Sequence, residues 1–160
     1  MTHRTTLALV ALSAASALAG CNRAPSEADA SAEVRKAALG VIAAYNAQDA
    51  HATAAYDAPD YVGIYHGSAN VIGPAADEAG MKAAMAAEKL DWRLGPDTVT
   101  VGKAGDIGIF EAPYNFTVTS PKGVSRESGT WVAIFRRQPD GSMKLWRSIA
   151  SDLPAEKAPS

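Results

Sequence analysis

The chain has 160 residues, 15 lysines and arginines, 17 aspartates and glutamates, and a formal net charge of −2. Its basic residues are scattered apart from the pair Arg136-Arg137, which excludes the dense positive patch on which nucleic-acid binding depends. The single cysteine excludes a disulfide bond within the chain. The length fits one domain of ordinary size behind a leader.

The first residues have the pattern of a secretory leader. A basic start with His3 and Arg4 precedes an apolar run over residues 7–19 and a small-residue cleavage site that ends at Cys21. The apolar run is shorter than the roughly twenty residues that a spanning helix needs, so residues 1–20 are predicted to be a cleavable signal peptide. The ending resembles a bacterial lipobox, which implies acylation of the cysteine. An ordinary signal peptide followed by a chance cysteine is the alternative.

Acylation of Cys21 would anchor the protein to a lipid bilayer without a spanning segment. Each buried methylene contributes about 0.8 kcal/mol, so two or more acyl chains hold a soluble domain firmly at the membrane. We therefore expect a lipoprotein of the cell envelope that faces the periplasm. Asn22, directly after the cysteine, favours the outer membrane over the inner one.

Helical periodicity begins behind a small polar stretch. Residues 21–32 have the composition of a disordered tether, and residues 153–160 have the same character. From residue 33 to residue 48 apolar side chains recur at helical spacing, and Ser31 can cap this helix. The domain is therefore predicted to occupy residues 33–152.

The next segments predict a short helix and a hairpin. Residues 49–56 follow a helix pattern that Asp49 can cap, and a proline-containing turn at residues 57–60 ends it. Residues 61–66 are rich in β-forming side chains, and a turn separates them from residues 71–72. A small hairpin is expected there.

A third helix and four long strands complete the predicted domain. The helix begins at Pro74 and runs to about Lys89, with Asp77 and Glu78 in its first turn, where carboxylates complement the helix dipole. Turn sequences then separate four strand-like segments, which are residues 92–101, 106–119, 123–137 and 143–151. This order predicts an α+β fold, with helices on one face of a strongly curved antiparallel sheet.

One strand is apolar on both faces. In residues 130–137, Val132 and Ile134 alternate with a second apolar set that includes Trp131 and Phe135. A single layer of helices covers only one side of a sheet. Either the C-terminal segment or a second subunit must cover the other, and we expect a homodimer.

Short motifs in this order resemble those of a known superfamily. They are Asn46-Ala47-Gln48-Asp49, Tyr56 with Asp60, Gly129 with Ile134-Phe135, and residues 140–144. Residues 33–152 resemble the nuclear transport factor 2-like superfamily, and within it the SnoaL-like, ketosteroid-isomerase-like domains. The resemblance implies a cone-shaped, cystatin-like fold, in which a curved sheet wraps around a long N-terminal helix, with two further helices and a mostly apolar pocket.

The isomerase chemistry of that superfamily is not expected here. It needs a carboxylate base beside an oxyanion hole made by a tyrosine and a protonated aspartate. The position of the oxyanion tyrosine falls near Val41, that of the base near Tyr65 and that of the protonated aspartate near Thr130, and none holds the required residue. Tyr45 lies one helical turn from the first position. Tyr45 and Trp131 are interpreted as core or interface aromatics rather than as ligand contacts.

Five polar residues among the apolar strands are the candidate ligand-binding groups: Tyr65, His66, Glu111, Tyr114 and Arg147. His66 is the best acid–base candidate because imidazole titrates near neutral pH, whereas its place beside Gly67 favours the end of a strand at the surface. Glu111 is either a pocket carboxylate or a residue at a strand bulge. Arg147 needs a carboxylate partner if it is buried, and Glu111 is the candidate.

Three functions remain open. The first is a pocket that binds a small, largely apolar ligand. The second is an enzyme of the isomerase, dehydratase or hydrolase type with His66 or Glu111 as general base. The third is a protein-interaction module of the envelope, which a closed, fully packed cone would favour. No cofactor is expected, and no metal either, because His51 and His66 lack ligand spacing; nucleophile-elbow and phosphate-loop motifs are absent from the sequence.

Overall fold

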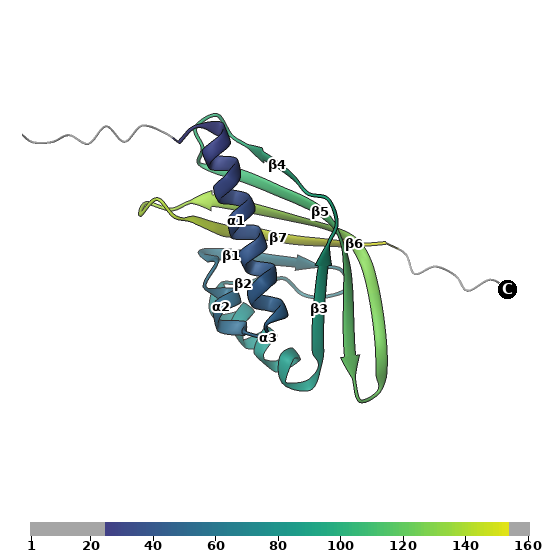
Figure 1. Ribbon diagram of the computed structural model, residues 1–160. Helices are drawn as coiled ribbons and strands as arrows, with labels where there is room; N and C mark the ends of the chain where they lie inside the picture. The colour runs from purple at the N-terminus through teal and green to yellow at the C-terminus, as the bar shows by residue number, and fades with distance from the viewer. Residues whose placement is uncertain (1–24, 154–160) are drawn as a thin grey trace, which may run out of the picture.

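Three helices lie against one curved seven-stranded sheet (Figure 1). The computed structural model describes residues 25–153, and the predicted signal peptide, Cys21 and the end of the predicted tail lie outside them. The helices are α1 Glu27–Asn46, α2 Ala50–Ala54 and α3 Pro74–Ala87. The strands are β1 Asp57–Tyr65, β2 Val71–Ile72, β3 Lys89–Leu94, β4 Thr98–Val101, β5 Ile107–Ser120, β6 Gly123–Arg137 and β7 Met143–Asp152.

The sheet has the strand order β2-β1-β7-β6-β5-β3, and β4 pairs with β5 beside β3. All neighbours are antiparallel except β1 and β7, which are parallel. Helix α1 crosses the inner face of the sheet, and α2 and α3 lie together at one end (Figure 1). This confirms the predicted α+β, cystatin-like architecture with a curved sheet around a long first helix.

Helix α1 begins six residues earlier than its periodicity predicted. Ser26 caps it by accepting a hydrogen bond from the backbone N–H of Asp29. Ala30 is fully buried, and it continues the stripe of Val34, Ala38 and Val41 that faces the sheet. Residues 27–32 are therefore helical rather than part of a tether. The small side chains among them allow the helix to approach the sheet closely. The same small residues are also typical of a disordered tether, so composition alone predicted disorder here.

The predicted turn at residues 57–60 is the start of strand β1. Its residues stay extended because β1 pairs with β7 in parallel, with Asp57 opposite Leu145. The pairing is irregular between Asp57 and Val62, and this irregularity accommodates Pro59, which has no N–H for a ladder. The hairpin of β1 and β2 and helix α3 lie where the sequence predicted them.

The predicted strand over residues 92–101 is two strands. Strands β3 and β4 both pair with β5, but they stop on either side of Gly95 and Pro96. The backbone N–H of Gly95 donates to the carbonyl of Pro113 at 2.8 Å. The break lets β3 turn away from β4 along the long β5–β6 hairpin, which gives the sheet its strong bend (Figure 1).

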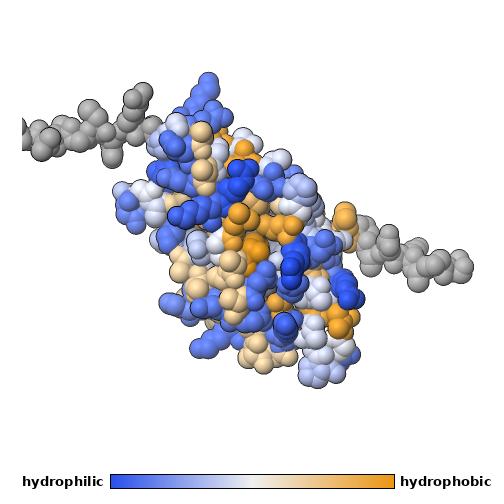
Figure 2. Space-filling view, in the orientation of Figure 1, coloured by the Kyte–Doolittle hydropathy of each residue, from blue (hydrophilic) through white to orange (hydrophobic). Residues whose placement is uncertain are grey.

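The core lies between α1 and the inner face of the sheet. Phe110, Trp131 and Phe135 are fully buried there with Val34. Helix α1 packs very closely on β5, since a Cβ added to Gly108 would meet Cγ2 of Val34 at 2.3 Å. The outer side of α1 stays at the surface, where hydrophobic side chains gather near the middle of this face among hydrophilic ones (Figure 2). Within residues 25–153, no helix is both long and apolar enough to cross a membrane.

Candidate functional site

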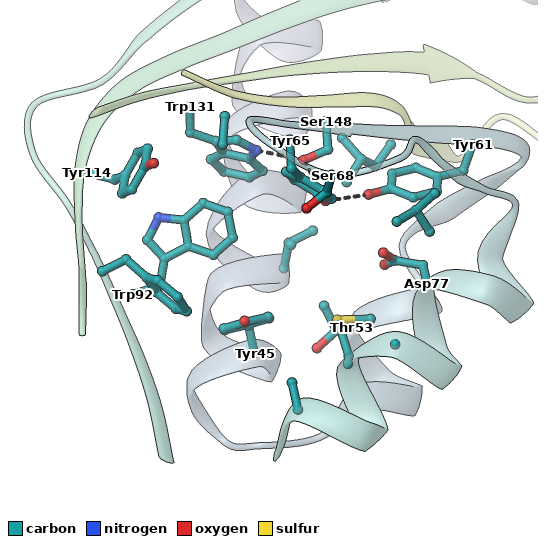
Figure 3. A pocket seen from close by; sticks show the side chains of 18 of the residues that line it. Tyr45, Thr53, Tyr61, Tyr65, Ser68, Asp77, Trp92, Tyr114, Trp131 and Ser148 are labelled. Atoms are coloured by element: carbon teal, nitrogen blue, oxygen red, sulfur yellow. Dashed lines mark hydrogen bonds between the residues drawn. The ribbon is translucent and has the colours of Figure 1, made fainter. Parts of the chain in front are cut away.

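A cavity of about 630 Å³ opens between the inner face of the sheet and the three helices (Figure 3). Its volume is in the range of pockets that hold small molecules. It is lined by Val41 and Tyr45 from α1, by Thr53 from α2, by one face of α3 and by strands β1, β3, β5, β6 and β7. The cone is therefore not filled by its own side chains.

One wall of the cavity is aromatic. Trp92 of β3 is its centre, with ring centroids 5.2 Å from Trp131, 5.5 Å from Tyr45 and 5.7 Å from Tyr114. These rings pack at tilted or edge-on angles, which aromatic pairs prefer. The indole Nε1 of Trp92 is buried and has no hydrogen-bond partner among the described residues. A hydrogen-bond acceptor on a molecule bound in the cavity would satisfy this N–H group.

Helix α3 forms a second wall with small side chains. Ala76, Gly80 and Ala84 line the cavity at a spacing of four residues, with Met81 between them. None of the helix's residues is buried. The helix lies over empty space rather than over packed side chains, so a bound molecule would supply the contacts that this face lacks.

A chain of hydrogen bonds crosses the sheet side of the cavity (Figure 3). The Nε1–H of Trp131 donates to Oγ of Ser148 at 3.0 Å, and the Tyr65 hydroxyl donates to the same oxygen at 3.4 Å. The hydroxyls of Tyr65 and Tyr61 are 2.8 Å apart. Burial raises the pKa of both tyrosines, so they stay neutral and hold this network as hydroxyls.

The network ends near two carboxyl groups. Asp77 of α3 and Asp57, the first residue of β1, lie close enough to Tyr61 and to each other to affect one another's pKa values. Burial raises the pKa of Asp57 to about 8, with a further contribution from the negative charge of Asp77. Burial also raises the pKa of Asp77 to about 6. At pH 7 the pair therefore holds one proton and one negative charge.

Three of the five sequence-predicted ligand residues line the cavity. Tyr65 lies in the hydrogen-bond chain, and the Tyr114 hydroxyl donates to Asp152 at the far side. His66 lies at the mouth, where its side chain is 82% exposed and its Nδ1 is 3.8 Å from Asp152. The structure thus places His66 near the surface end of β1, which was the alternative reading of this residue.

Glu111 and Arg147 do not line the cavity. Glu111 lies between the inward-facing Phe110 and Ala112 of β5, so strand alternation places it on the outer face, where it is exposed. Arg147 donates to the carbonyl of Asp60 at 2.9 Å and lies over the ring of Trp146, 4.1 Å from its centroid. Among the described ion pairs, none joins Glu111 to Arg147.

Of the three positions that correspond to isomerase catalytic residues, two line the cavity and one does not. Val41 and Tyr65 line the cavity, whereas Thr130 is not among its lining residues. Tyr45 and Trp131, interpreted from the sequence as core or interface aromatics, both contribute to the cavity wall. Trp131 is also fully buried, so it serves the core and the cavity together.

The sequence analysis missed the carboxyl pair. Asp57 was placed in a turn, and Asp77 was explained by the helix dipole. A usable signal was the α3 pattern, in which Ala76, Gly80 and Ala84 form a stripe too small to fill a core. Within residues 25–153, no group of three His, Cys, Asp or Glu side chains could hold a metal ion.

Comparison with known proteins agrees with this fold. The family model of the SnoaL-like domain matches residues 34–156, so the chain belongs to the SnoaL-like domain family. No curated protein matches it.

Solved structures show the same fold. A nuclear transport factor 2-like protein with a cystatin-like fold from Novosphingobium aromaticivorans has a TM-score of 0.66 and 23% identity, covering 81% of this chain and 85% of that chain. A candidate dehydratase of the same family from Streptomyces avermitilis has a TM-score of 0.70 and 19% identity, covering 81% and 99%. A ketosteroid isomerase-like protein from Erwinia carotovora atroseptica has a TM-score of 0.66 and 17% identity, covering 78% and 96%.

Proposed function

We propose that this chain is a lipid-anchored protein of the cell envelope whose cavity binds a small, largely apolar ligand. The observation that carries the binding function is the cavity of about 630 Å³ between an aromatic wall and a helix with no buried residue. The anchoring at Cys21, the periplasmic orientation and the preference for the outer membrane rest on the leader sequence. An unfilled cone also speaks against the third function, a fully packed interaction module.

The test is capture of the ligand. The chain from residue 22 onward, exported to the periplasm behind a cleavable leader without the cysteine, is analysed by native mass spectrometry and then extracted under denaturing conditions. We expect a co-purifying small molecule. The Ala84→Phe variant fills the cavity from α3 and is expected to lose it. Ala83→Phe is the matched control, because Ala83 is exposed on the same helix and does not line the cavity. Equal ligand content in both variants would contradict binding in this cavity.

A second function, acid–base catalysis on the bound molecule, is supported by the carboxyl pair. A general base works best with a pKa near the working pH, and Asp57 and Asp77 have pKa values raised to about 8 and about 6. The two aspartates would take the role of general base that the sequence analysis gave to Glu111, which lies on the outer face, or to His66, which lies at the mouth. Turnover of the captured ligand by the wild type, lost in Asp57→Asn, would establish this function; an unchanged ligand would exclude it.

We also propose a homodimer through the outer face of the sheet. Ile109 and Ile134 are paired across β5 and β6, and Val132 and Ile149 across β6 and β7. Ile64 adjoins Ile149 on β1. Residues paired in this way share a face, and Ile64 and Ile109 are more than a third exposed. These residues form an apolar patch beside Glu111 and Arg147 on the same face, and an exposed apolar patch is typical of an interface.

A further inference from the structure

The ionisable side chains that line the cavity are almost all acidic. They are Asp57, Asp77, Glu127 and Asp152, and the lining residues include no lysine or arginine. His66 is the one basic side chain among them, and it lies at the exposed mouth. The low dielectric of an apolar cavity strengthens the field of such charges, so the cavity favours a positively charged guest and opposes an anion.

Asp57 is the least exposed of these acids, and one of its oxygens has no hydrogen-bond partner among the described residues. Its side chain lines the cavity, the residue is 8% exposed, and its Oδ2 accepts no hydrogen bond from any described residue. The proton that the pair holds at pH 7 can bridge Asp57 and Asp77, but it leaves the pair with one negative charge that no described side chain in the cavity neutralises. The nearby Lys144 does not satisfy this oxygen either: its Nζ donates to the carbonyl of Ala55 at 2.5 Å, makes no hydrogen bond to Asp57 Oδ2, and Lys144 does not line the cavity.

The aromatic wall lies across the cavity from the carboxyl pair. Figure 3 shows Asp77 on α3 at one side and Trp92 and Tyr114 at the other, with the open space between them. A molecule that spans the cavity therefore meets the carboxyl pair at one end and, at the other, aromatic rings, of which Tyr114 is bonded to Asp152. The Nε1–H of Trp92, which has no hydrogen-bond partner among the described residues, offers one donor to a polar atom in the apolar part of the bound molecule.

We propose, building on the ligand-binding function above, that the ligand is a small hydrophobic amine. Its ammonium group binds between Asp57 and Asp77, and its apolar body lies against Trp92, Tyr45 and Trp131. An ammonium fits because it carries three donors and no acceptor, so it satisfies the unpartnered oxygen of Asp57 and neutralises the pair. The aromatic faces also attract a cation that is drawn into the cavity.

The inference is tested with three probes of one shape. The chain from residue 22 onward, which contains every described residue, is titrated by calorimetry at pH 7.5 with 4-phenylbutylamine, 4-phenylbutan-1-ol and 4-phenylbutanoate. We expect the amine to bind at least tenfold more tightly than the alcohol, and the carboxylate to bind most weakly. The amine's affinity should fall as the pH is lowered through about 6, where Asp77 gains its proton, while the alcohol's affinity should not fall.

Variants locate the charge. Asp77→Asn should remove most of the preference for the amine and leave the alcohol's affinity unchanged, which also shows that the cavity is intact. Glu78→Gln is the matched control, because Glu78 is the next residue on α3, pairs with His51 at 3.2 Å and does not line the cavity.

Each remaining outcome is decisive. Equal binding of amine and alcohol overturns the amine inference and leaves the proposed ligand-binding function in place. Binding of none of the probes overturns both. An equal loss in Asp77→Asn and Glu78→Gln overturns the placement of the ammonium at the carboxyl pair.

Discussion

The hydroxyls of Tyr61 and Tyr65 meet at 2.8 Å directly above Gly63, the residue midway between them on β1. A Cβ at residue 63 would lie 2.7 Å from Cε2 of Tyr65 and 2.8 Å from the Tyr61 hydroxyl. Both distances are too short for ordinary contact. Glycine is therefore required here by the close approach of two rings, and the hydrogen-bond chain of the cavity depends on it.

Gly63→Ala is expected to separate the two hydroxyls and to lower the free energy of unfolding by about 1–3 kcal/mol, the usual effect of overpacking. Urea denaturation measures the loss. Gly80→Ala is the control, because nothing lies within 4 Å of a Cβ there and alanine within a helix is more stable than glycine by about 0.5–1 kcal/mol. A Gly63→Ala protein as stable as the wild type would contradict the packing described for the two tyrosines.

Ser148 is the shared acceptor of the network and is 3% exposed. Ser148→Ala leaves the buried Nε1–H of Trp131 without an acceptor and is expected to cost about 1–3 kcal/mol of unfolding free energy. Thermal or urea unfolding measures this. Ser151→Ala on the same strand, where the side chain is exposed, should stay within about 0.5 kcal/mol of the wild type. Equal stabilities of the two variants would show that Ser148 does not hold the network.

The carboxyl pair makes stability depend on pH. The pKa of Asp57 is raised to about 8 by burial and by Asp77, whereas in the unfolded chain an aspartate titrates near 3.9. Between about pH 6 and pH 8 the folded state therefore keeps a proton that the unfolded state has released. This contribution to stability is fully present below the unfolded pKa and is lost as the pH rises toward the folded pKa of about 8.

Urea unfolding at pH 6 and pH 8 checks this slope. Asp57→Asn cannot titrate, so its stability should change little between the two pH values and should exceed that of the wild type at pH 8. Lys144 opposes the rise in the pKa of Asp57, so Lys144→Met should steepen the slope. A wild type equally stable at pH 6 and pH 8 would contradict a buried carboxyl at this position.

The homodimer is tested by light scattering coupled to size-exclusion chromatography. Ile134→Glu introduces a charge into the apolar outer face of the sheet and should convert a dimer to a monomer. Leu39→Glu is the control, since Leu39 is 48% exposed on α1, at the opposite face of the sheet. A monomeric wild type, or a dimer that tolerates Ile134→Glu and not Leu39→Glu, would contradict an interface on the outer face.

The order of the elements could be predicted from the sequence because its turns and helix caps act locally. Gly73-Pro74 starts α3 and Asp49 caps α2 as expected. The start of α1 could not be predicted, because the burial of Ala30 depends on a distant loop: a Cβ on Gly105 would lie 3.7 Å from it. Small residues such as Ala30 are common both in tethers and in closely packed helices, so their presence does not distinguish the two.

The site was predictable only in part for the same reason. Tyr65 and Tyr114 lie on strands whose alternation shows which side chains share a face, and both line the cavity. Asp57 could not be found, because its place in β1 comes from pairing with Leu145, far along the chain. Glu111 was misjudged as a pocket candidate because a carboxylate in an apolar run has the same sequence pattern whichever face it occupies.

The parallel pairing of β1 with β7 also governs when the cavity can form. β1 bears Asp57, Tyr61 and Tyr65, whereas its partner β7 supplies Ser148 and is the last strand in sequence. Contacts between segments so distant in sequence close late and slow the folding of a domain. During synthesis, the segment with the acidic and tyrosine side chains therefore stays unpaired along one edge until residues 143–152 have been made. A chain arrested before that point would expose its apolar strands, and this exposure would distinguish unfinished copies from finished ones for chaperones and proteases.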